Sequence, residues 1–331
     1  MTASAGDDVL RQREGSMPDF ECPSCGGAGQ VPNATGASPL VRCGDCGLMF
    51  RKPNDIAPTL HANIVAFERM ARGRWESFYD GWNARERGKI LDHLRSPGKA
   101  LEIGPGRGAF IAYLRKEGYR VEGVDISGDI CADLEDRFGV RMVHGTLEEF
   151  QGDGSYDLIA AHHVVEHVQD IRSFLGKCRS LLAPGGGLLV SCPNVASWAA
   201  AFRSWPGYEP YHCLFFTPES LVKALGKCGY TVSGVRLRQP FTGWWNVLFR
   251  SLAGTRGAGA RPNVASKDRS RPVRFLYNGV RFVGSALLLP LTIVADRLSR
   301  GEEIVILAVK ADAYARAPVA ADMAERVGPG P

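Results

Sequence analysis

From about residue 99 to residue 310, short apolar runs of strand length alternate with stretches whose apolar residues recur every three or four positions. This alternation is typical of a mostly parallel α/β sheet, because a helix returns the chain after each strand. Seven strands are predicted, at 99–103, 119–126, 141–145, 156–162, 187–192, 231–238 and 303–310. A further helix is predicted to begin at Thr217-Pro218, an N-cap followed by a first-turn proline, and to end at Gly229.

The turn after the first predicted strand is rich in glycine. Glu102 is followed by glycines at 104, 106 and 108. Glycines let backbone amides approach a ligand closely, and this turn lies at the edge where open α/β sheets bind cofactors. Asp125 ends the next strand, where its carboxylate would accept hydrogen bonds from two ribose hydroxyls. A dinucleotide site would instead space its glycines as GxGxxG to hold a pyrophosphate.

These motifs resemble those of the class I S-adenosylmethionine-dependent methyltransferases. The resemblance covers roughly residues 85–240 and the strand at 303–310. It implies a Rossmann-like, seven-stranded, mostly parallel sheet with an antiparallel last strand, and S-adenosyl-L-methionine as the cofactor. Among subfamilies, the sequence is most similar to small-molecule O-methyltransferases related to the ubiquinone-biosynthesis enzyme, many of which act on sugars, quinones or natural products.

The resemblance also implies which residues hold the cofactor. EIGPGRG is similar to the family's first motif, whose glycines line the methionine part while the acid supports the loop. Asp125 matches the ribose-binding acid, and HGTLEEF (144–150) is similar to the stretch that contacts adenine. The expected cofactor residues are Glu102, Gly104, Gly106, Gly108, Asp125, Ile126, Thr146, Leu147 and His162. LLAPGGGLLVSCPN (181–194) is similar to the family's helix, turn and fifth strand.

The fourth predicted strand ends in a histidine cluster, at the edge where the methyl group should lie. After His162 the sequence reads His163-Val-Val-Glu166-His167. In the ubiquinone-type relatives a glutamate stands at the position of His163, and the motif implies a metal that positions the acceptor. His163, Glu166 and His167 are therefore candidates for a divalent ion, because residues three and four apart share a helix face. The alternatives are His167 or His163 as a general base, and a structural role.

A second wall of the acceptor site is expected from residues 196–216. Relatives often have a histidine before the apolar residues and Thr-Pro-Glu-Ser-Leu, and His212 stands at that position. His212 is predicted either to reach the acceptor or to anchor this loop through a hydrogen bond. It completes the set of candidate catalytic residues with His167 and His163.

The connection between the last two predicted strands is unusually long. It runs over residues 240–301, whereas a hairpin commonly uses about two to five residues. Its middle, 250–274, carries seven basic residues, and an apolar run over 282–295 follows that is shorter than a membrane-spanning helix. Three interpretations are open: a helix packed over the active-site edge, peripheral membrane contact through 275–298 that gathers a lipid-linked acceptor, and RNA binding by the basic stretch.

Four cysteines near the start form two CxxC pairs, Cys22 with Cys25 and Cys43 with Cys46. Their spacing is typical of a four-thiolate zinc site, and neighbouring glycines permit turns that aim amides at the sulfurs. A site with four thiolates has no open position for water, so the zinc is predicted to be structural. Free thiols and a redox pair are the alternatives. The segment is similar to the zinc ribbon that some of these methyltransferases carry.

The composition, 45% hydrophobic and 23% charged residues, excludes a collagen-like, coiled-coil or wholly disordered chain. The domains predicted are a disordered tail (1–18), a zinc ribbon (19–54), a helical lead-in (55–95), a methyltransferase domain (96–312) with the insertion at 240–301, and a disordered tail (313–331). No charged-then-apolar leader is visible, so a reducing, cytoplasmic setting is expected, with the inner face of a membrane as an option.

The function predicted is methyl transfer to a hydroxyl of a small molecule, a sugar or a lipid-linked glycan. One alternative is an RNA-base methyltransferase that grips RNA through the ribbon and the basic insertion. The net charge of +5 is too mild to indicate nucleic acid by itself. Another alternative is a non-catalytic zinc- or cofactor-binding scaffold, against which the intact glycine turn and Asp125 argue.

Overall fold

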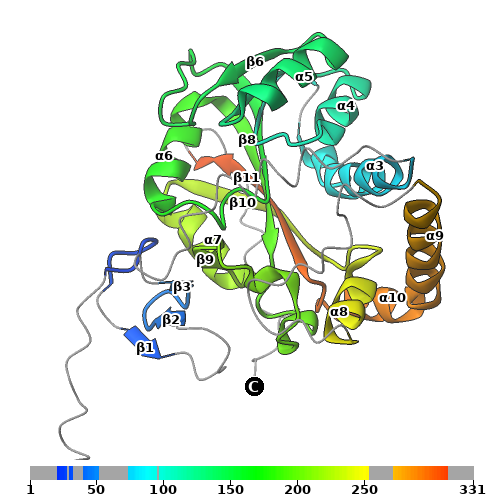
Figure 1. Ribbon diagram of the computed structural model, residues 1–331. Helices are drawn as coiled ribbons and strands as arrows, with labels where there is room; N and C mark the ends of the chain where they lie inside the picture. The colour runs from blue at the N-terminus through cyan, green and yellow to red at the C-terminus, as the bar shows by residue number, and fades with distance from the viewer. Residues whose placement is uncertain are drawn as a thin grey trace, which may run out of the picture.

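The computed structural model describes residues 21–27, 30–32, 40–51, 74–94, 97–252 and 271–311. Its centre is a seven-stranded sheet with the order β10-β11-β8-β7-β4-β5-β6 (Figure 1). The strands are β4 (Lys99–Ile103), β5 (Arg120–Asp125), β6 (Arg141–His144), β7 (Tyr156–His162), β8 (Leu182–Pro193), β10 (Tyr230–Arg238) and β11 (Glu303–Lys310). β11 runs antiparallel to both of its neighbours, β10 and β8, and the other four strand pairings of this sheet are parallel. The predicted Rossmann-like fold class is confirmed.

Six of the seven strands lie within one residue of their predicted bounds, and β8 is the exception. It begins at Leu182, in a stretch expected to be a turn, because the ladder with β7 contains a bulge. Tyr156 pairs with Leu182, but Leu158 already pairs with Gly187. A Cβ on Gly186 would lie 2.7 Å from the Tyr156 carbonyl oxygen, so glycine is required where the bulged chain passes its neighbour.

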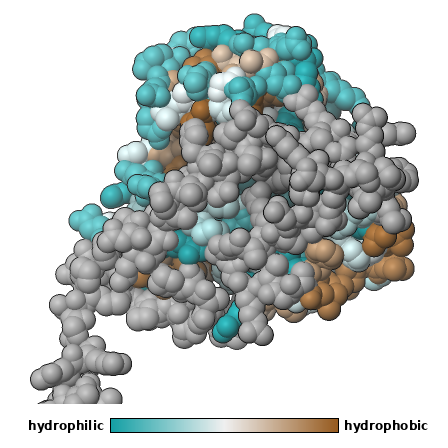
Figure 2. Space-filling model, viewed as in Figure 1, coloured by the Kyte–Doolittle hydropathy of each residue, from teal (hydrophilic) through white to brown (hydrophobic). Residues whose placement is uncertain are grey.

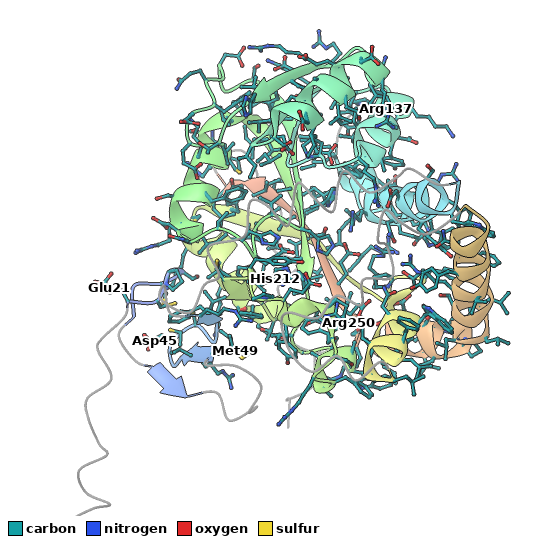
Figure 3. All side chains as sticks on the ribbon, viewed as in Figure 1. Glu21, Asp45, Met49, Arg137, His212 and Arg250 are labelled. Atoms are coloured by element: carbon teal, nitrogen blue, oxygen red, sulfur yellow. The ribbon has the colours of Figure 1, made fainter. Side chains whose placement is uncertain are left out.

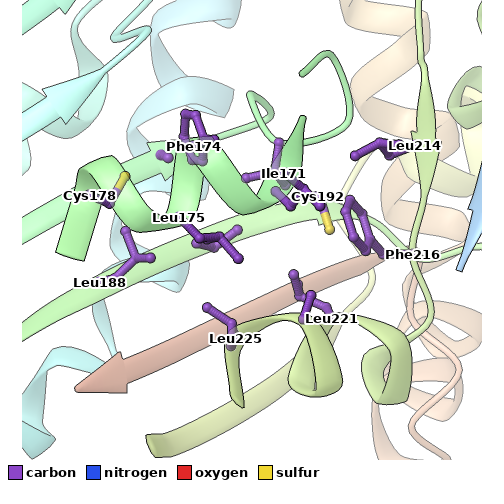
Figure 4. Close-up of a cluster of buried hydrophobic side chains, with 14 of the residues drawn as sticks. Ile171, Phe174, Leu175, Cys178, Leu188, Cys192, Leu214, Phe216, Leu221 and Leu225 are labelled. Carbon is purple, nitrogen blue, oxygen red and sulfur yellow. The ribbon is translucent and has the colours of Figure 1, made fainter. Parts of the chain in front are cut away.

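Helices cover both faces of the sheet, and alternate strand residues point to opposite faces. α6 (Ile171–Leu181) and α7 (Pro218–Lys227) pack on one face, where Leu175 and Leu225 surround Leu188 (Figure 4). α3 (Arg74–Gly88), α4 (Ala109–Lys116) and α5 (Gly128–Phe138) cover the other face, against Leu158 and Leu189. The sheet is therefore buried on both sides, and its carboxyl edge is left to form a site.

The predicted start of α7 is confirmed. Thr217 is its N-cap, and its Oγ1 accepts from the Ser220 amide at 3.2 Å while the Ser220 hydroxyl accepts from the Thr217 amide at 3.0 Å. Pro218 occupies the first turn, and Gly229, with φ of 78°, follows the end of the helix. These reciprocal bonds satisfy amides that a helix start leaves free.

The long connection between β10 and β11 forms three helices, α8 (Gly243–Leu252), α9 (Arg271–Leu287) and α10 (Leu289–Arg297). Pro290 lies in the first turn of α10, which explains the break after α9. Within the described residues, no single helix has the length and hydropathy to cross a membrane. The residues 277–287 and 289–297 meet that criterion only as a pair bent by 51°. Residues 253–270, most of the basic stretch, lie outside the described residues.

A smaller sheet has the order β1-β2-β3-β9. Its first three strands are β1 (Gln30–Pro32), β2 (Leu40–Cys43) and β3 (Met49–Arg51), from the segment predicted to be a ribbon. The fourth, β9 (Leu214–Phe215), comes from the loop that follows β8. The N-terminal segment is thus joined by main-chain pairing to the loop that carries His212.

Three short 3₁₀ helices complete the described elements: η2 (Leu91–His93), η3 (Ala199–Ala201) and η4 (Pro206–Tyr208). In its described part, the helical lead-in predicted over 55–95 corresponds to α3 and η2. The predicted tails, 1–18 and 313–331, and the part of the lead-in before residue 74 lie outside the described residues.

Candidate active site

The glycine turn connects β4 to α4 at the carboxyl edge of the sheet. Gly104, Gly106 and Gly108 have φ of 62°, 52° and 76°, in the left-handed region that favours glycine. A Cβ on Gly108 would lie 2.4 Å from Leu134 Cδ2, so a side chain there would also clash with α5. The three glycines therefore form a tight turn at the edge of the sheet where the sequence predicts the cofactor.

Glu102 lies beneath this turn and is 2% exposed. Burial raises the pKa of Glu102 to about 8. The charge of Arg87 and a hydrogen bond from the Ile111 amide oppose this rise, and the charge of Asp125 adds to it. Ile111 belongs to the first turn of α4, so the carboxyl group also satisfies a free helix amide. Its Oε2 is buried and has no hydrogen-bond partner among the described residues.

The ends of β5 and β6 lie beside the turn. Asp125 is buried, and its Oδ1 accepts from the Ser127 amide at 2.8 Å, which fixes the carboxylate at the start of α5. The carbonyl of Ile126 accepts from His144 Nε2 at 3.2 Å, which ties the two strand ends together. Thr146 is exposed and bonds Glu149, whereas Leu147 is buried in the core. Asp125, Ile126 and Thr146 thus lie at one edge, with Leu147 beneath it.

His162 is the last residue of β7, next to β4 in the sheet. Its Nδ1 lies 3.0 Å from the Ser191 hydroxyl, and its ring meets Phe110 edge-on with centroids 4.3 Å apart. Burial lowers the pKa of His162 well below its ordinary value, and the charge of Arg87 lowers it further. Its Nε2, like Glu102 Oε2, has no partner among the described residues. Two unpartnered polar atoms at one sheet edge fit a polar cofactor.

His163 follows in a left-handed backbone conformation, with φ of 56°. Its Nδ1 lies 3.1 Å from Glu166 Oε1 and its Nε2 lies 3.1 Å from Glu303 Oε1. Carboxylates only accept, so both ring nitrogens donate. Desolvation lowers the pKa of His163, but the bonds to these two carboxylates outweigh it and raise the value to about 9. Although 42% of its side chain is exposed, His163 has no nitrogen left for a metal or a proton.

Glu303 joins this cluster from the start of β11 and was not predicted from the sequence. Arg87 of α3 donates to its Oε1 at 2.7 Å, and Arg238 at the end of β10 donates to its Oε2. Burial raises the pKa of Glu303, but the charges of Arg87 and Arg238 hold it well below its ordinary range. The adjacent acidic pair at 302–303, where the last strand starts, is the only signal in the sequence that marks this position.

Three further side chains converge from two segments. Glu166 and His167 follow β7 in the chain. His212, labelled in Figure 3, comes from the loop before β9. The Glu166 carbonyl accepts from the Cys213 amide at 2.7 Å, which holds this loop against the histidine cluster. One donor atom from each of the three lies within 4.8 Å of the others, a spacing at which they could hold a metal ion. His163 is outside this group, so the metal set differs from the predicted one.

The two histidines of this group have the same orientation. Nδ1 of His167 donates to the Tyr211 carbonyl at 3.3 Å, and Nδ1 of His212 donates to the Gly207 carbonyl at 2.8 Å. A carbonyl only accepts, so the proton of each neutral ring lies on Nδ1 and the lone pair on Nε2. Such an Nε2 can accept a proton or bind a metal.

The charge states of this group follow from its burial. Burial lowers the pKa of His167, with the charge of Glu166 opposing. Burial and the neighbouring His167 lower the pKa of His212 to about 4. Burial raises the pKa of Glu166, but the hydrogen bond and the charge of His163 outweigh burial and lower this pKa to about 2. Near neutral pH the site therefore holds one carboxylate and two neutral imidazoles.

The four N-terminal cysteines lie together. Cys22 Sγ is 3.5 Å from Cys46 Sγ, and Cys25 Sγ is 3.5 Å from Cys43 Sγ; one sulfur from each lies within 4.8 Å of the others. Gly26 and Gly47, with φ of 72° and 78°, close the two turns as predicted. Burial raises the pKa of Cys43, but the amides of Cys46 and Asp45 lower it overall to about 7. Four such sulfurs fit a tetrahedral zinc ion.

Arg51 links this segment to the loop that carries His212, and the sequence analysis did not single it out. The side chain is buried, and its guanidinium donates to the carbonyls of His212, Tyr208 and Glu209 at 2.9, 3.1 and 3.4 Å. It also lies over the Phe215 ring, 5.3 Å from the centroid. The sequence carries no local signal for this role, because every one of these partners lies far along the chain.

Comparison with known proteins is consistent with this geometry. Residues 75–234 match the family described as "Methyltransferase domain". This part of the chain, just under half of its length, is therefore similar to that family. The ubiquinone biosynthesis O-methyltransferase of Bradyrhizobium sp. (strain ORS 278) is 31% identical over 165 residues, which are 45% of this chain and 65% of that protein. The enzyme of the same name from Cronobacter sakazakii is 33% identical over 112 residues, 31% of this chain and 46% of that protein.

The chain therefore spans about half to two thirds of the length of these relatives. Among solved structures, a SAM-dependent methyltransferase from Archaeoglobus fulgidus has a TM-score of 0.47 and 22% identity, covering 74% of this chain and 99% of that one. The 1,6-didemethyltoxoflavin-N1-methyltransferase of Burkholderia thailandensis, solved with S-adenosylhomocysteine, has a TM-score of 0.47 and 18% identity, covering 82% and 95%. Both TM-scores lie below 0.5.

Proposed function

We propose that the protein transfers a methyl group from S-adenosyl-L-methionine to a hydroxyl of a small molecule, a sugar or a lipid-linked glycan. The observation that carries the proposal is the pair His167 and His212, whose Nδ1 atoms donate to carbonyls and whose Nε2 atoms have no hydrogen-bond partner among the described residues. Both are neutral near pH 7, as a general base must be. Both histidines belong to segments that leave strands at the carboxyl edge of the sheet, the edge where the glycine turn also lies.

The cofactor would be held at the carboxyl ends of β4, β5, β6 and β7. Asp125 would accept from the ribose hydroxyls, and the turn over 104–108 would lie along the methionine part. The unpartnered atoms Glu102 Oε2 and His162 Nε2 support a polar group between β4 and β7. Ile126, Thr146 and Leu147 remain proposed for the adenosine side. When bound, the cofactor supplies a methyl group already activated on a sulfonium.

The protein's own task is then to orient the acceptor and to take its proton. We assign the role of proton acceptor to Nε2 of His167. The proton would move from the acceptor hydroxyl to this imidazole as the oxygen–methyl bond forms and the methyl–sulfur bond breaks. Glu166, held as a carboxylate by His163, stabilises the imidazolium that results. His212 borders the acceptor on the other side of this group.

A divalent ion on Glu166, His167 and His212 is the alternative use of the same atoms. Two imidazoles and one carboxylate are ligands for such ions, and an open position would orient the acceptor oxygen. In that case His167 would be a ligand and would not take the proton. Activity with and without added Mg²⁺, measured on protein that keeps one zinc ion per chain, separates the two uses. At the N-terminal end, we propose one structural zinc on Cys22, Cys25, Cys43 and Cys46.

The acceptor class is tested by incubating the full chain with methyl-labelled S-adenosyl-L-methionine and extracts of the source cell. Label in the polar-metabolite or lipid fraction, at a base-stable ether, supports the proposal. Label in RNA, together with RNA affinity that falls steeply with salt, would indicate an RNA-base methyltransferase instead. Absence of cofactor binding in a calorimetric titration would leave only a zinc-dependent scaffold.

A further inference from the structure

On helices α9 and α10 the apolar residues face outward and the polar residues face inward, the reverse of a helix that faces water. Every exposed residue between Tyr277 and Ala295 is apolar. The largest exposed side chains in this stretch include Val280, Val283, Leu287, Leu291, Ile293 and Val294, which are 38% to 76% exposed. A helix on the surface of a globular protein normally presents charged and polar residues outward. We call this outward surface the α9–α10 face.

The polar residues of the same stretch point inward. Asn278, Ser285 and Thr292 are 4%, 0% and 6% exposed. Arg281 also turns toward the protein, where it donates to the Thr242 hydroxyl at 3.0 Å and lies 4.9 Å from the centroid of the Tyr79 ring. These contacts fix the orientation of α9, so its apolar side cannot rotate inward without breaking them. The exposure of the α9–α10 face is therefore built into the packing.

A contiguous apolar surface marks a site of interaction with a protein or a membrane. Figure 2 shows the apolar residues gathered over α9 and α10. The exposed part of this stretch contains only aliphatic residues, alanine and proline, whereas protein interfaces are enriched in aromatic residues, methionine and arginine, with a polar rim. A purely aliphatic surface matches the acyl chains of a lipid layer better than it matches another protein.

The sequence that contains the α9–α10 face, with the stretch before it, carries a positive charge that suits an anionic membrane. The sequence from 269 to 295 contains arginines at 269, 271, 274 and 281 and no acidic residue. The preceding stretch 250–268 adds four basic residues and one acid. Basic residues beside an amphipathic segment attract anionic lipid headgroups. Exposed aromatic rings of α3 flank the face: Phe78 and Trp82 are each 47% exposed, and Phe78 contacts Phe282 of α9. Such rings favour the headgroup region.

The α9–α10 face also adjoins the acceptor side of the site. Ala295 of α10 packs with Ala199, Trp205 and Trp244, in a cluster formed with the loop after β8. Trp205 in turn donates to Glu302 at 3.1 Å, beside the Glu303 cluster. A membrane bound at α9 and α10 would therefore lie next to the wall of the acceptor site.

We propose that the α9–α10 face inserts into the surface of a bilayer that contains anionic lipids, so that the protein is a peripheral membrane protein. The two helices lie in the interface and do not cross the bilayer, because they are bent by 51° and neither alone is long enough. This inference goes beyond the transfer reaction, and it is measured without turnover.

The test is co-sedimentation of the full chain with vesicles. We expect binding to phosphatidylcholine vesicles that contain about one quarter phosphatidylglycerol, and weaker binding to phosphatidylcholine alone or in high salt. The variant Leu287→Asp/Ile293→Asp places two carboxylates on the face at exposed positions, so the fold is kept. It should lower the partition coefficient about tenfold or more.

The matched control is Ala112→Asp/Ala132→Asp, which adds the same two charges at exposed positions of α4 and α5. It should bind vesicles like the wild type. The proposal is overturned if the wild type stays in the supernatant with anionic vesicles, or if both double variants bind equally. It is also overturned if the face serves self-association, seen as a dimer by analytical ultracentrifugation that Leu287→Asp/Ile293→Asp dissociates while vesicle binding is absent.

Discussion

Nε of Arg51 donates to the main-chain carbonyl of His212 at 2.9 Å, across 161 residues of sequence. Arg51 ends β3 of the four-cysteine segment, and His212 is one of the two histidines whose Nδ1 donates to a main-chain carbonyl. The pairing of Phe50 with Leu214 continues the connection through the main chain. The N-terminal segment therefore acts as a support for the wall that carries His212, and Arg51 is a positioning residue rather than a catalytic one.

Replacing Arg51 should disturb the acceptor side and spare the cofactor side. Arg51→Met leaves the carbonyls of Tyr208, Glu209 and His212 without their charged donor, so the free energy of unfolding should fall by about 2–3 kcal/mol. We expect a higher KM for the acceptor and an unchanged Kd for S-adenosyl-L-methionine. Arg51→Lys should rescue only part of the effect, because one ammonium cannot reproduce the planar fork.

The control for this variant is Arg42→Met, on the exposed side of β2. It removes the same charge from the same segment and should alter neither parameter. A purely structural role would lower stability with both constants unchanged, and equal changes in both constants would show that Arg51 does not act selectively on the acceptor wall.

Asp125→Ala should weaken cofactor binding about 10- to 100-fold, because one carboxylate would lose charged hydrogen bonds with ribose hydroxyls. Isothermal titration with S-adenosyl-L-methionine measures the loss. Asp136→Ala, on the exposed side of α5, removes an acid from the same region and should bind normally. Unchanged affinity in Asp125→Ala would contradict the ribose assignment.

His167→Ala should lower kcat by about 10²-fold or more with cofactor affinity kept, because a positioned base contributes that much to proton removal. Burial lowers the pKa of His167, so the wild-type rate should fall on the acid side only below pH 6.5, the ordinary value for histidine. His144→Gln, at an exposed histidine, should leave this acid limb in place. Normal turnover of His167→Ala at neutral pH would rule out the base.

Glu102→Gln should change how stability depends on pH. Burial raises the pKa of Glu102 from 4.5 to about 8. Between these values the folded chain binds a proton that the unfolded chain does not, so this group's contribution to stability falls as pH rises through the window. Urea unfolding should give similar stabilities for wild type and variant near pH 5 and a relatively more stable variant above pH 8. Parallel curves for the wild type and Glu102→Gln would contradict the assignment.

The residues of the site that could be predicted from the sequence are those whose positions depend on segments close together along the chain. Gly104 and Asp125 could be placed because a glycine turn and the next strand end meet wherever parallel strands are neighbours. Arg51 and Glu303 could not, since Arg51 reaches His212 across 161 residues and Glu303 reaches His163 across 140. The apolar stretch of α9 and α10 was visible too, but the sequence could not tell which face points outward. The buried positions of Asn278, Ser285 and Thr292, with the inward contacts of Arg281, decide that.

Loss of metal from the four-cysteine segment should impair the acceptor site and leave the cofactor site unchanged. Cys22→Ser removes one of four zinc ligands, and zinc content measured by mass spectrometry should fall from one ion per chain to well below one. Because β3 and Arg51 depend on that segment, the acceptor KM should rise as in Arg51→Met while cofactor affinity stays constant. Cys228→Ser, at a cysteine outside the cluster, should keep both zinc and KM. Full zinc content in Cys22→Ser would disprove the site, and a normal KM without zinc would disprove the coupling.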